Sequence, residues 1–393
     1  MENLFHKPIS RLGFGCMRLP EGQDGEYIES EIEQMFDYAM SHGINYFDSA
    51  WHYIDSQLMI GKYLTPKHPR DSFILVGKLH FHEDTLHNWK LAMEGFEKEL
   101  RDAGTDYMDL ELMHAIGDEE SLRVIAREDF WRFMRELKAS GRAKHIGFSW
   151  HGKPDDLDRL LTEHPEIEVV QIQANYFDHF TESRYANGGS WDTYEICRRH
   201  GKPVTIMEPI KGGSLAQVDQ HPEIKTLLQE ADSTQSPAAW ALRYAAGLEG
   251  VITILSGMST IEQMQENERI LLTDYKPLSA ENKAMLERVA KIIESKRPVG
   301  CTGCRYCMDK GCPAGIRIPN VLSSLNTLHQ YQNIRTARKE YYETIGEHRP
   351  IECLGCGTCE IECPQGLPIR QLIREADEKL WVGENYDVWA NHE

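Results

Sequence analysis

Cysteines are concentrated near one end of this chain, in two runs of nearly equal spacing. Eight of the ten cysteines lie after residue 300. The first run is CTGCRYCMDKGCP, beginning at Cys301, and the second is CLGCGTCEIECP, beginning at Cys353. The rest of the chain has only Cys16 and Cys197, which we expect to be packed, inert thiols. Such clustering predicts bound metal rather than a disulfide framework.

The spacing within each run predicts iron–sulfur clusters. Three cysteines at intervals of three can hold three corners of a cubane, and a fourth that precedes proline ligates the other cluster in two-cluster ferredoxins. Zinc is the alternative, but structural zinc usually takes paired CxxC knuckles. We therefore predict two [4Fe-4S] clusters whose ligands cross over between the runs. The first would bind Cys301, Cys304, Cys307 and Cys363, and the second Cys353, Cys356, Cys359 and Cys312.

This cysteine-rich region resembles the bacterial dicluster ferredoxins. The forty residues between Cys312 and Cys353 are too many for the compact β-hairpin version of that fold. The segments PNVLSSLNTLHQYQ and RTARKEYYETI have a helical pattern. An α-helical ferredoxin is therefore the better match.

Residues 1 to about 275 alternate short apolar runs with amphipathic stretches. Eight strands alternating with helices favour a closed (β/α)8 TIM barrel. A doubly wound sheet is the competing α/β layout, but no helix follows the GFG after the first predicted strand. We place the barrel at 1–296 and a helical dicluster domain with its tail at 297–393. The predicted strands are 11–15, 44–48, 73–78, 107–114, 145–149, 169–173, 203–208 and 251–255.

Charge and hydropathy limit the partners. The net charge of −19 argues against nucleic acid, since phosphate binding needs a basic surface. No apolar run approaches the roughly 20 residues of a membrane span. The first residues, MENLFHKPIS, lack a secretory signal pattern. These features predict a cytoplasmic protein with no membrane partner.

Four residues near the ends of the second, third and fourth predicted strands form a coherent acid–base set. They are Asp48, Tyr53, Lys78 and His114. Carbonyl reduction needs a proton donor for the developing alkoxide, and an ammonium beside a tyrosine lowers its pKa. An aspartate would hold the lysine, and a histidine would orient the carbonyl oxygen.

The first 290 residues resemble the aldo-keto reductase family. The segments GINYFDSAWHY, ILVGK, DLELMH, HIGFSWHG, VVQIQANY and GMSTIEQMQEN follow the family's order. The resemblance implies that Asp48, Tyr53, Lys78 and His114 are its catalytic tetrad, with Tyr53 as general acid or base. It further implies an oxidoreductase that uses NADP(H) or NAD(H).

The same resemblance implies the cofactor contacts. Ser149 and Gln171 match positions that hold the nicotinamide amide, and Met207 stands where the family often has a stacking aromatic. NADP(H) is the family default, but two positions that are basic in many NADPH-dependent members are neutral here, which keeps NAD(H) in contention. The remaining expected contacts are Lys211, Gly212 and Gly213 on the pyrophosphate, and Gly257, Met258, Gln263 and Asn267 at the adenosine end.

Trp51, Trp150 and His151 lie on predicted loops after strands. We interpret them as walls of a pocket for a planar or polar carbonyl or alcohol, the small-molecule substrate.

The leading prediction is an NAD(P)H-dependent oxidoreductase with a dicluster ferredoxin domain. Nicotinamide moves two electrons together, whereas a [4Fe-4S] cluster moves one at a time. The clusters would therefore be structural, serve a flavoprotein or ferredoxin partner, or act on the substrate directly. The alternatives are an electron-transfer subunit with the barrel as a docking scaffold, and a redox sensor whose barrel binds nucleotide.

Overall fold

The computed structural model describes residues 4–22, 25–53, 55–83, 85–181, 190–309, 312–346, 348–384 and 386. The chain forms two compact units. The barrel unit comprises Met1–Pro209 and Ala241–Ser279, and the helical unit comprises Ile210–Trp240 and Ala280–Glu393. The domain boundary between residues 296 and 297 stays a prediction.

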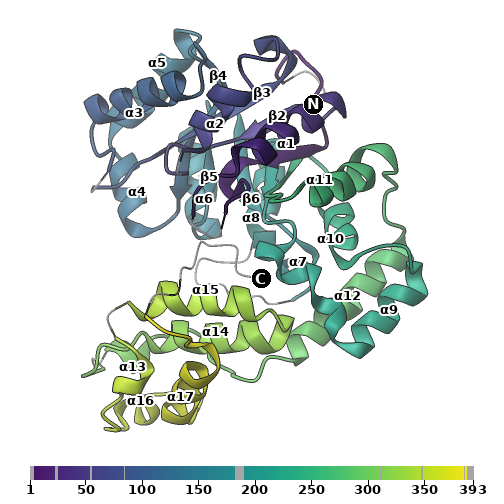
Figure 1. Ribbon diagram of the computed structural model, residues 1–393. Coiled ribbons are helices and arrows are strands. Elements are labelled where there is room, and N and C mark those ends of the chain that lie inside the picture. The colour runs from purple at the N-terminus through teal and green to yellow at the C-terminus, as the bar shows by residue number, and fades with distance from the viewer. Residues whose placement is uncertain are drawn as a thin grey trace. The chain divides into compact units, whose positions relative to one another are not determined.

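Eight parallel strands close into a barrel in sequence order, and β8 pairs with β1 (Figure 1). The (β/α)8 architecture expected from the sequence is therefore confirmed. Strands such as ILVGKLH are buried on both faces because one face lines the barrel and the other meets the helices. The strands are β1 Leu12–Gly15, β2 Tyr46–Asp48, β3 Ile74–His80, β4 Met108–Ile116, β5 Ala143–Trp150, β6 Val169–Gln173, β7 Val204–Met207 and β8 Val251–Ser256.

Amphipathic helices cover the outside of the barrel. α3, for example, begins after Asn88, whose side chain accepts a hydrogen bond from Leu91 N, and it buries Ala92, Phe96 and Leu100 at intervals of four. The helices here are α1 Glu29–Ser41, α2 Ser56–Tyr63, α3 Trp89–Asp102, α4 Glu119–Ile125, α5 Glu128–Ala139, α6 Pro154–Glu163, α7 Tyr176–Phe180, α8 Ser190–Arg199, α10 Pro237–Ala246 and α11 Ile261–Glu268.

Apolar side chains fill the barrel near the amino ends of its strands. Phe5 packs edge-on against Tyr46, the first residue of β2. Ile74 and Val169, which begin β3 and β6, belong to the same buried cluster. Because this end is filled, chemistry is left to the carboxyl ends of the strands, as is general for this fold.

The helical unit has a core of its own. α14 packs against α15 and α17 (Figure 1). Their buried residues include Leu322, Leu325, Tyr341 and Ile373. This mainly helical architecture agrees with the sequence prediction. The helices are α9 Pro222–Asp232, α12 Ala280–Ser295, α13 Tyr306–Asp309, α14 Ile318–Tyr331, α15 Ile334–Ile345, α16 Thr358–Ile361 and α17 Ile369–Leu380.

The segment that follows β7 belongs to the helical unit. Its buried His221 contacts the end of α14: Nε2 lies 3.0 Å from the Gln330 carbonyl oxygen, and Nδ1 lies 3.1 Å from Gln332 Nε2. Lys296, just after α12, forms an ion pair with Glu223 of α9. The segment is therefore tied to residues far later in the sequence.

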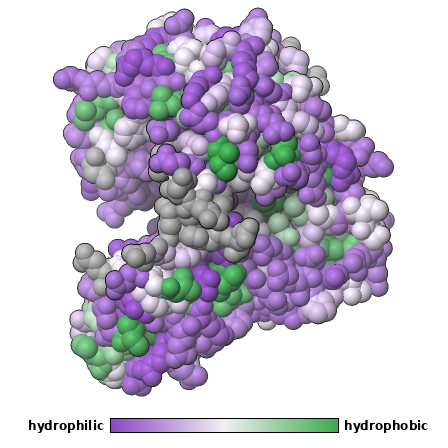
Figure 2. All heavy atoms as spheres, in the orientation of Figure 1, coloured by the Kyte–Doolittle hydropathy of each residue, from purple (hydrophilic) through white to green (hydrophobic). Residues whose placement is uncertain are grey.

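The face drawn in Figure 2 is mainly hydrophilic, with hydrophobic side chains scattered over it. Among the described residues, no helix has the length and apolar character needed to cross a membrane.

Candidate active site and cluster-binding cysteines

The four predicted acid–base residues come from three consecutive strands and the loop after β2. Asp48 is the last residue of β2, and Lys78 and His114 lie in the carboxyl halves of β3 and β4. Tyr53 lies in the loop after β2. Its backbone N–H donates a hydrogen bond to the Ala50 carbonyl oxygen, which forms a turn. Parallel strands of a barrel bring these ends together.

Lys78 is at the centre of this group and is completely buried. Its Nζ donates to Asp48 Oδ1 at 2.6 Å, to the Ser49 carbonyl oxygen at 2.6 Å and to Tyr53 Oη at 3.3 Å. Burial alone would lower the pKa of Lys78, but the Asp48 carboxylate and Tyr53 outweigh it and raise that pKa. The lysine is therefore an ammonium at neutral pH, held against the tyrosine oxygen.

Tyr53 and His114 meet edge to face. Their ring centroids are 5.5 Å apart and the ring planes make an angle of 82°. Burial raises the pKa of Tyr53, and the Lys78 ammonium opposes this rise without cancelling it. Lys78 does lower the pKa of Tyr53, as expected from the sequence, but burial raises that pKa by more. Tyr53 keeps its proton at neutral pH and can act as an acid.

His114 is neutral. Burial, reinforced by the Lys78 charge and by neighbouring histidines, holds its pKa well below the ordinary value. Its Nδ1 is buried without a hydrogen-bond partner. A neutral imidazole has one N–H to donate, which suits it to orient a carbonyl oxygen.

Two histidines that the sequence analysis did not single out lie beside the four. The His80 ring centroid is 6.1 Å from that of His114 and 5.3 Å from that of His52. His52 and His80 are visible in the sequence, but their spacing matches no known motif.

The predicted nicotinamide contacts lie side by side on β5 and β6. Ser149 pairs in register with Gln171, and both are buried. Ser149 Oγ accepts from Ala115 N at 2.7 Å, whereas Gln171 Oε1 has no partner. Gln171 Nε2 lies 3.8 Å from Met207 Sδ, so Met207 lies beside the predicted amide site.

The loop predicted to bind pyrophosphate, Lys211–Ala216, consists of 3-10 turns with a kink at two glycines. Gly212 and Gly213 have φ angles of 62° and 94°, which glycine adopts at little cost. A Cβ added to either would meet open space. This loop belongs to the helical unit.

The predicted adenosine-end residues lie after β8. Gln263 Oε1 accepts from Ser259 N at 2.9 Å, and Asn267 Nδ2 donates to Ser256 Oγ at 3.1 Å. Met258 is buried, and Gly257 is exposed.

An arginine that the sequence analysis missed lies against Gly257. The nearest heavy atom to a Cβ added at Gly257 would be Arg18 Cδ, at 3.5 Å. Arg18 ends the 3-10 turn after β1. Sequence reasoning missed this contact because Arg18 and Gly257 are far apart in the sequence.

The three predicted pocket residues all lie near strand ends. Trp51 is half-buried, and its backbone N–H donates to the Lys78 carbonyl oxygen at 3.0 Å. Trp150 is buried, and its indole N–H has no partner. His151 is half-buried, and burial lowers its pKa. A charge on the His151 ring would lower the pKa of His114, so the two histidines lie near each other.

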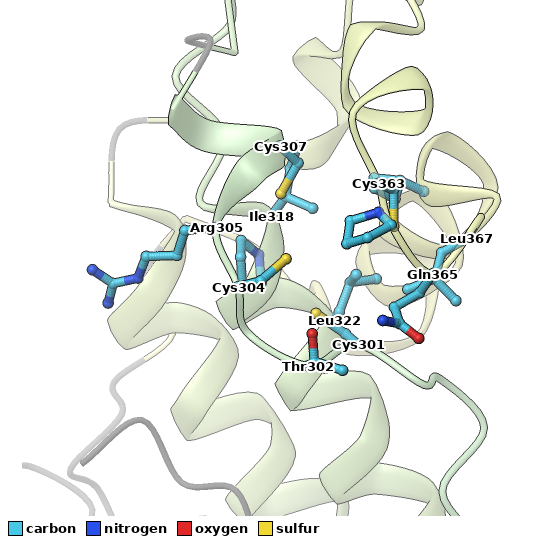
Figure 3. Close-up of a pocket in the computed structure, with 13 residues that line it drawn as sticks. Cys301, Thr302, Cys304, Arg305, Cys307, Ile318, Leu322, Cys363, Gln365 and Leu367 are labelled. Carbon is cyan, nitrogen blue, oxygen red and sulfur yellow. The ribbon is translucent and has the colours of Figure 1, made fainter. Parts of the chain in front are cut away.

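The eight clustered cysteines line two hollows in the helical unit. The first hollow is shown in Figure 3, where Cys301, Cys304 and Cys307 lie on one side and Cys363 on the other. The apolar side chains of Ile318, Leu322 and Leu367 complete its wall. The second is lined by Cys312, Cys353, Cys356 and Cys359, and by Cys307, which lines both hollows. Each hollow thus gathers the four cysteines that the crossover pattern predicts for one cluster.

The donor set and the space suit a cubane. Among the described residues, no three His, Cys, Asp or Glu side chains converge as the ligands of a single metal ion do. A cubane instead needs four thiolates around a space, since each binds a different iron. Hydrogen bonds from Thr358 lower the pKa of Cys356, whereas burial raises the pKa of Cys301, Cys307 and Cys359. The residues present therefore fit iron–sulfur clusters.

Comparison with known proteins agrees with both halves. Residues 11–291 match the model of the aldo/keto reductase family, and residues 300–367 match that of a 4Fe-4S dicluster domain. An NADPH-dependent alpha-keto amide reductase of Saccharomyces cerevisiae is 27% identical over 48% of this chain and 57% of its own length. The chain thus spans little more than half of that relative.

Two other similar proteins extend over more of the barrel. L-galactose dehydrogenase of Arabidopsis thaliana is 24% identical over 73% of this chain and 91% of its own length. A Klebsiella pneumoniae aldo/keto reductase, solved with NADP and acetate, superposes with a TM-score of 0.58 at 22% identity. That structure covers 72% of this chain and 92% of its own. The chain belongs to the aldo/keto reductase family and carries a 4Fe-4S dicluster domain after its barrel.

Proposed function

We propose that this protein is an NAD(P)H-dependent oxidoreductase that reduces a small carbonyl compound or oxidises the corresponding alcohol. The observation that carries the proposal is the buried Lys78 ammonium, bonded at once to Asp48 and to Tyr53. The nicotinamide nucleotide supplies or takes up the hydride. Tyr53 gives its proton to the carbonyl oxygen, and the Lys78 ammonium stabilises the tyrosinate that remains. Neutral His114 donates a hydrogen bond that orients the same oxygen.

The nucleotide contacts are proposed at the positions named from the sequence. Ser149 and the unpartnered oxygen of Gln171 would hold the nicotinamide amide. The role of the Gly212–Gly213 turn at the pyrophosphate stays a prediction from the sequence. Arg18, beside Gly257, supplies a positive charge that could meet a 2′-phosphate. This favours NADPH, which also appears in the name of the yeast relative.

We propose a polar carbonyl substrate, since the site is surrounded by imidazoles and indoles. Trp51, Trp150 and His151 would form its walls, joined by His52 and His80. The two relatives are named for an alpha-keto amide and for a sugar, which are both polar carbonyl or alcohol compounds.

The clusters could also serve a partner protein, and one observation supports that role. The four most exposed large apolar side chains described lie within two residues of a clustered cysteine. They are Tyr306, Ile351, Leu354 and Ile361, the last with 82% of its surface exposed. Cys304 and Cys356 are themselves exposed. An electron-transfer subunit that docks a flavoprotein or ferredoxin here is the second candidate function.

We propose the cytoplasm as the location of the protein, because the cysteine ligands must stay reduced until the clusters form.

Carbonyl reduction is tested with anaerobic wild-type protein. We expect NADPH to be oxidised when a 2-oxo amide, a sugar aldehyde or an aromatic aldehyde is added, and not without a carbonyl. The cluster absorbance should stay unchanged, because losing one electron would leave a high-energy nicotinamide radical. Dithionite, added last, should bleach it. Bleaching by NADPH, with no carbonyl reduced, would contradict the proposal and favour the electron-transfer subunit.

The number and pairing of the clusters are tested by iron analysis. Wild-type protein made anaerobically should carry about eight irons per chain. Cys363→Ser and Cys301→Ser should each lose about four irons and show the same spectrum, that of the second cluster. Cys353→Ser should also lose about four irons but show the spectrum of the first cluster. Cys197→Ser, which removes a buried thiol outside the runs, is the control and should keep all the iron. Stoichiometric zinc, or a Cys363→Ser spectrum that matches Cys353→Ser, would overturn the assignment.

A further inference from the structure

Two glutamates are completely buried in the wall of the barrel and take no part in the chemistry above. Glu99 lies on α3 and Glu111 on β4, and neither has any exposed surface. Leu110 and Leu112 fill the barrel, so Glu111, between them, faces the surrounding helices. A buried carboxyl group is expensive unless it is hydrogen-bonded or shares a proton. The arrangement therefore needs an explanation.

The two carboxyl groups meet over Gly77, the residue before Lys78. Gly77 pairs in register with Glu111. A Cβ added to Gly77 would lie 2.5 Å from Glu111 Oε2 and 3.3 Å from Glu99 Oε2. The missing side chain at this position is what makes room for both groups.

One oxygen of Glu99 joins the two elements that carry the proposed acid and its lysine. Glu99 Oε1 accepts from Gln57 Nε2 at 2.6 Å and from the Lys78 backbone N at 3.2 Å. Gln57 is in the first turn of α2, directly after the loop of Tyr53, whose carbonyl oxygen accepts from Ser56 N at 3.3 Å. Glu99 thus ties α2 to β3 from behind.

The pair holds a proton at neutral pH. Burial raises the pKa of Glu99 to about 7, against the hydrogen bond of Gln57 and the Lys78 charge. Burial and the neighbouring Glu99 hold the pKa of Glu111 well above its ordinary value. The titratable groups that act on the pair are thus each other and Lys78, since Gln57 is uncharged. Glu111 keeps its proton, although neither of its oxygens has a hydrogen-bond partner.

We propose that Glu99 is a positioning residue for carbonyl reduction, because its carboxyl fixes the Tyr53 loop relative to the Lys78 strand. The inference rests on the proposed function. Ionised Glu99 accepts stronger hydrogen bonds than neutral Glu99 does. The acid and its lysine are therefore held best above neutral pH.

Four variants test this through the pH profile of kcat. In wild-type protein, kcat should rise as the pH increases through about 7, because Glu99 ionises there. Glu99→Gln keeps an accepting oxygen and should keep activity but lose this step. Glu99→Leu keeps no acceptor, and kcat should fall about 10- to 100-fold with an unchanged Kd for NADPH. Glu111→Gln and Glu111→Leu are the matched controls: both put an uncharged group beside Glu99, so neither should remove the step near 7.

A melting series gives a result that does not depend on activity. The pKa of Glu99 is about 7 in the folded protein against an ordinary 4.5, so the folded state binds more protons between these values. Wild-type protein therefore loses stability as the pH rises from 4.5 to 7. Glu99→Gln lacks this loss, so its Tm relative to wild type should increase over the same range.

The two failures are distinguishable. A wild type that reduces no carbonyl would contradict the proposed function, and the melting series would still test the raised pKa of Glu99. Full kcat in Glu99→Leu, a pH step that persists in Glu99→Gln, or a constant Tm difference would overturn the inference.

Discussion

Replacing Tyr53 with phenylalanine is expected to lower kcat for carbonyl reduction by roughly 10²- to 10⁴-fold, the usual contribution of a general acid. The phenol is the group that Lys78 Nζ contacts at 3.3 Å, and burial keeps it protonated. Phenylalanine fills the same space, so the Kd for NADPH, measured by fluorescence titration, should not change. The rate loss would then belong to proton transfer.

Tyr46→Phe is the matched control for that variant. Tyr46 is a second tyrosine of the barrel, fully buried, and its hydroxyl has no hydrogen-bond partner. Removing that hydroxyl leaves no group unpaired, so activity and stability should be kept. If Tyr53→Phe retained most of the rate, or if Tyr46→Phe lost as much, Tyr53 would not be the proton donor.

Replacing Lys78 with methionine is expected to abolish most activity and to destabilise the barrel by about 3–5 kcal/mol. The lysine and Asp48 form a fully buried ion pair at 2.6 Å, and one Asp48 oxygen already has no partner. Without the ammonium, Asp48 is a buried charge, or it takes up a proton as the pH falls. Denaturant unfolding followed by tryptophan fluorescence measures the loss, which should be smaller at acid pH.

The double variant Asp48→Asn, Lys78→Met separates stability from catalysis. With both charges removed, no buried charge is left unpaired, so stability should largely return. Activity should not return, because nothing remains to stabilise the tyrosinate. Recovery of the rate in the double variant would show that Lys78 acts through folding alone.

The barrel could be predicted because its pattern is repeated along the chain. Each strand is a short apolar run between turn residues, and all eight predicted strands overlap the observed ones. The four acid–base residues could be found because barrel topology alone brings strand ends together. Lys78 and Asp48 are neighbours for that reason, although 30 positions separate them.

Features that depend on distant packing could not be predicted. In the sequence, Glu99 looks like any acidic residue of an amphipathic helix. Its burial beside Glu111 depends on the space that Gly77, which has no side chain, leaves between the strand and the helix. Arg18 meets Gly257 because β1 closes the barrel against β8. The rise in the pKa of Tyr53 also escaped sequence reasoning, since it follows from burial, which outweighs the neighbouring charge.

The segment that follows β7 also bears on how such a protein can be shortened or recombined. Residues 210–240 precede the cysteine region in the gene, yet they fold with residues 280–393. A chain ended at residue 296 would leave His221 without Gln330 and Gln332, although every residue of the segment were still present. Residues 210–240 are thus part of the helical unit, although they lie within the barrel's stretch of sequence. Exchange of the cysteine region between relatives would therefore have to carry residues 210–240 along with it.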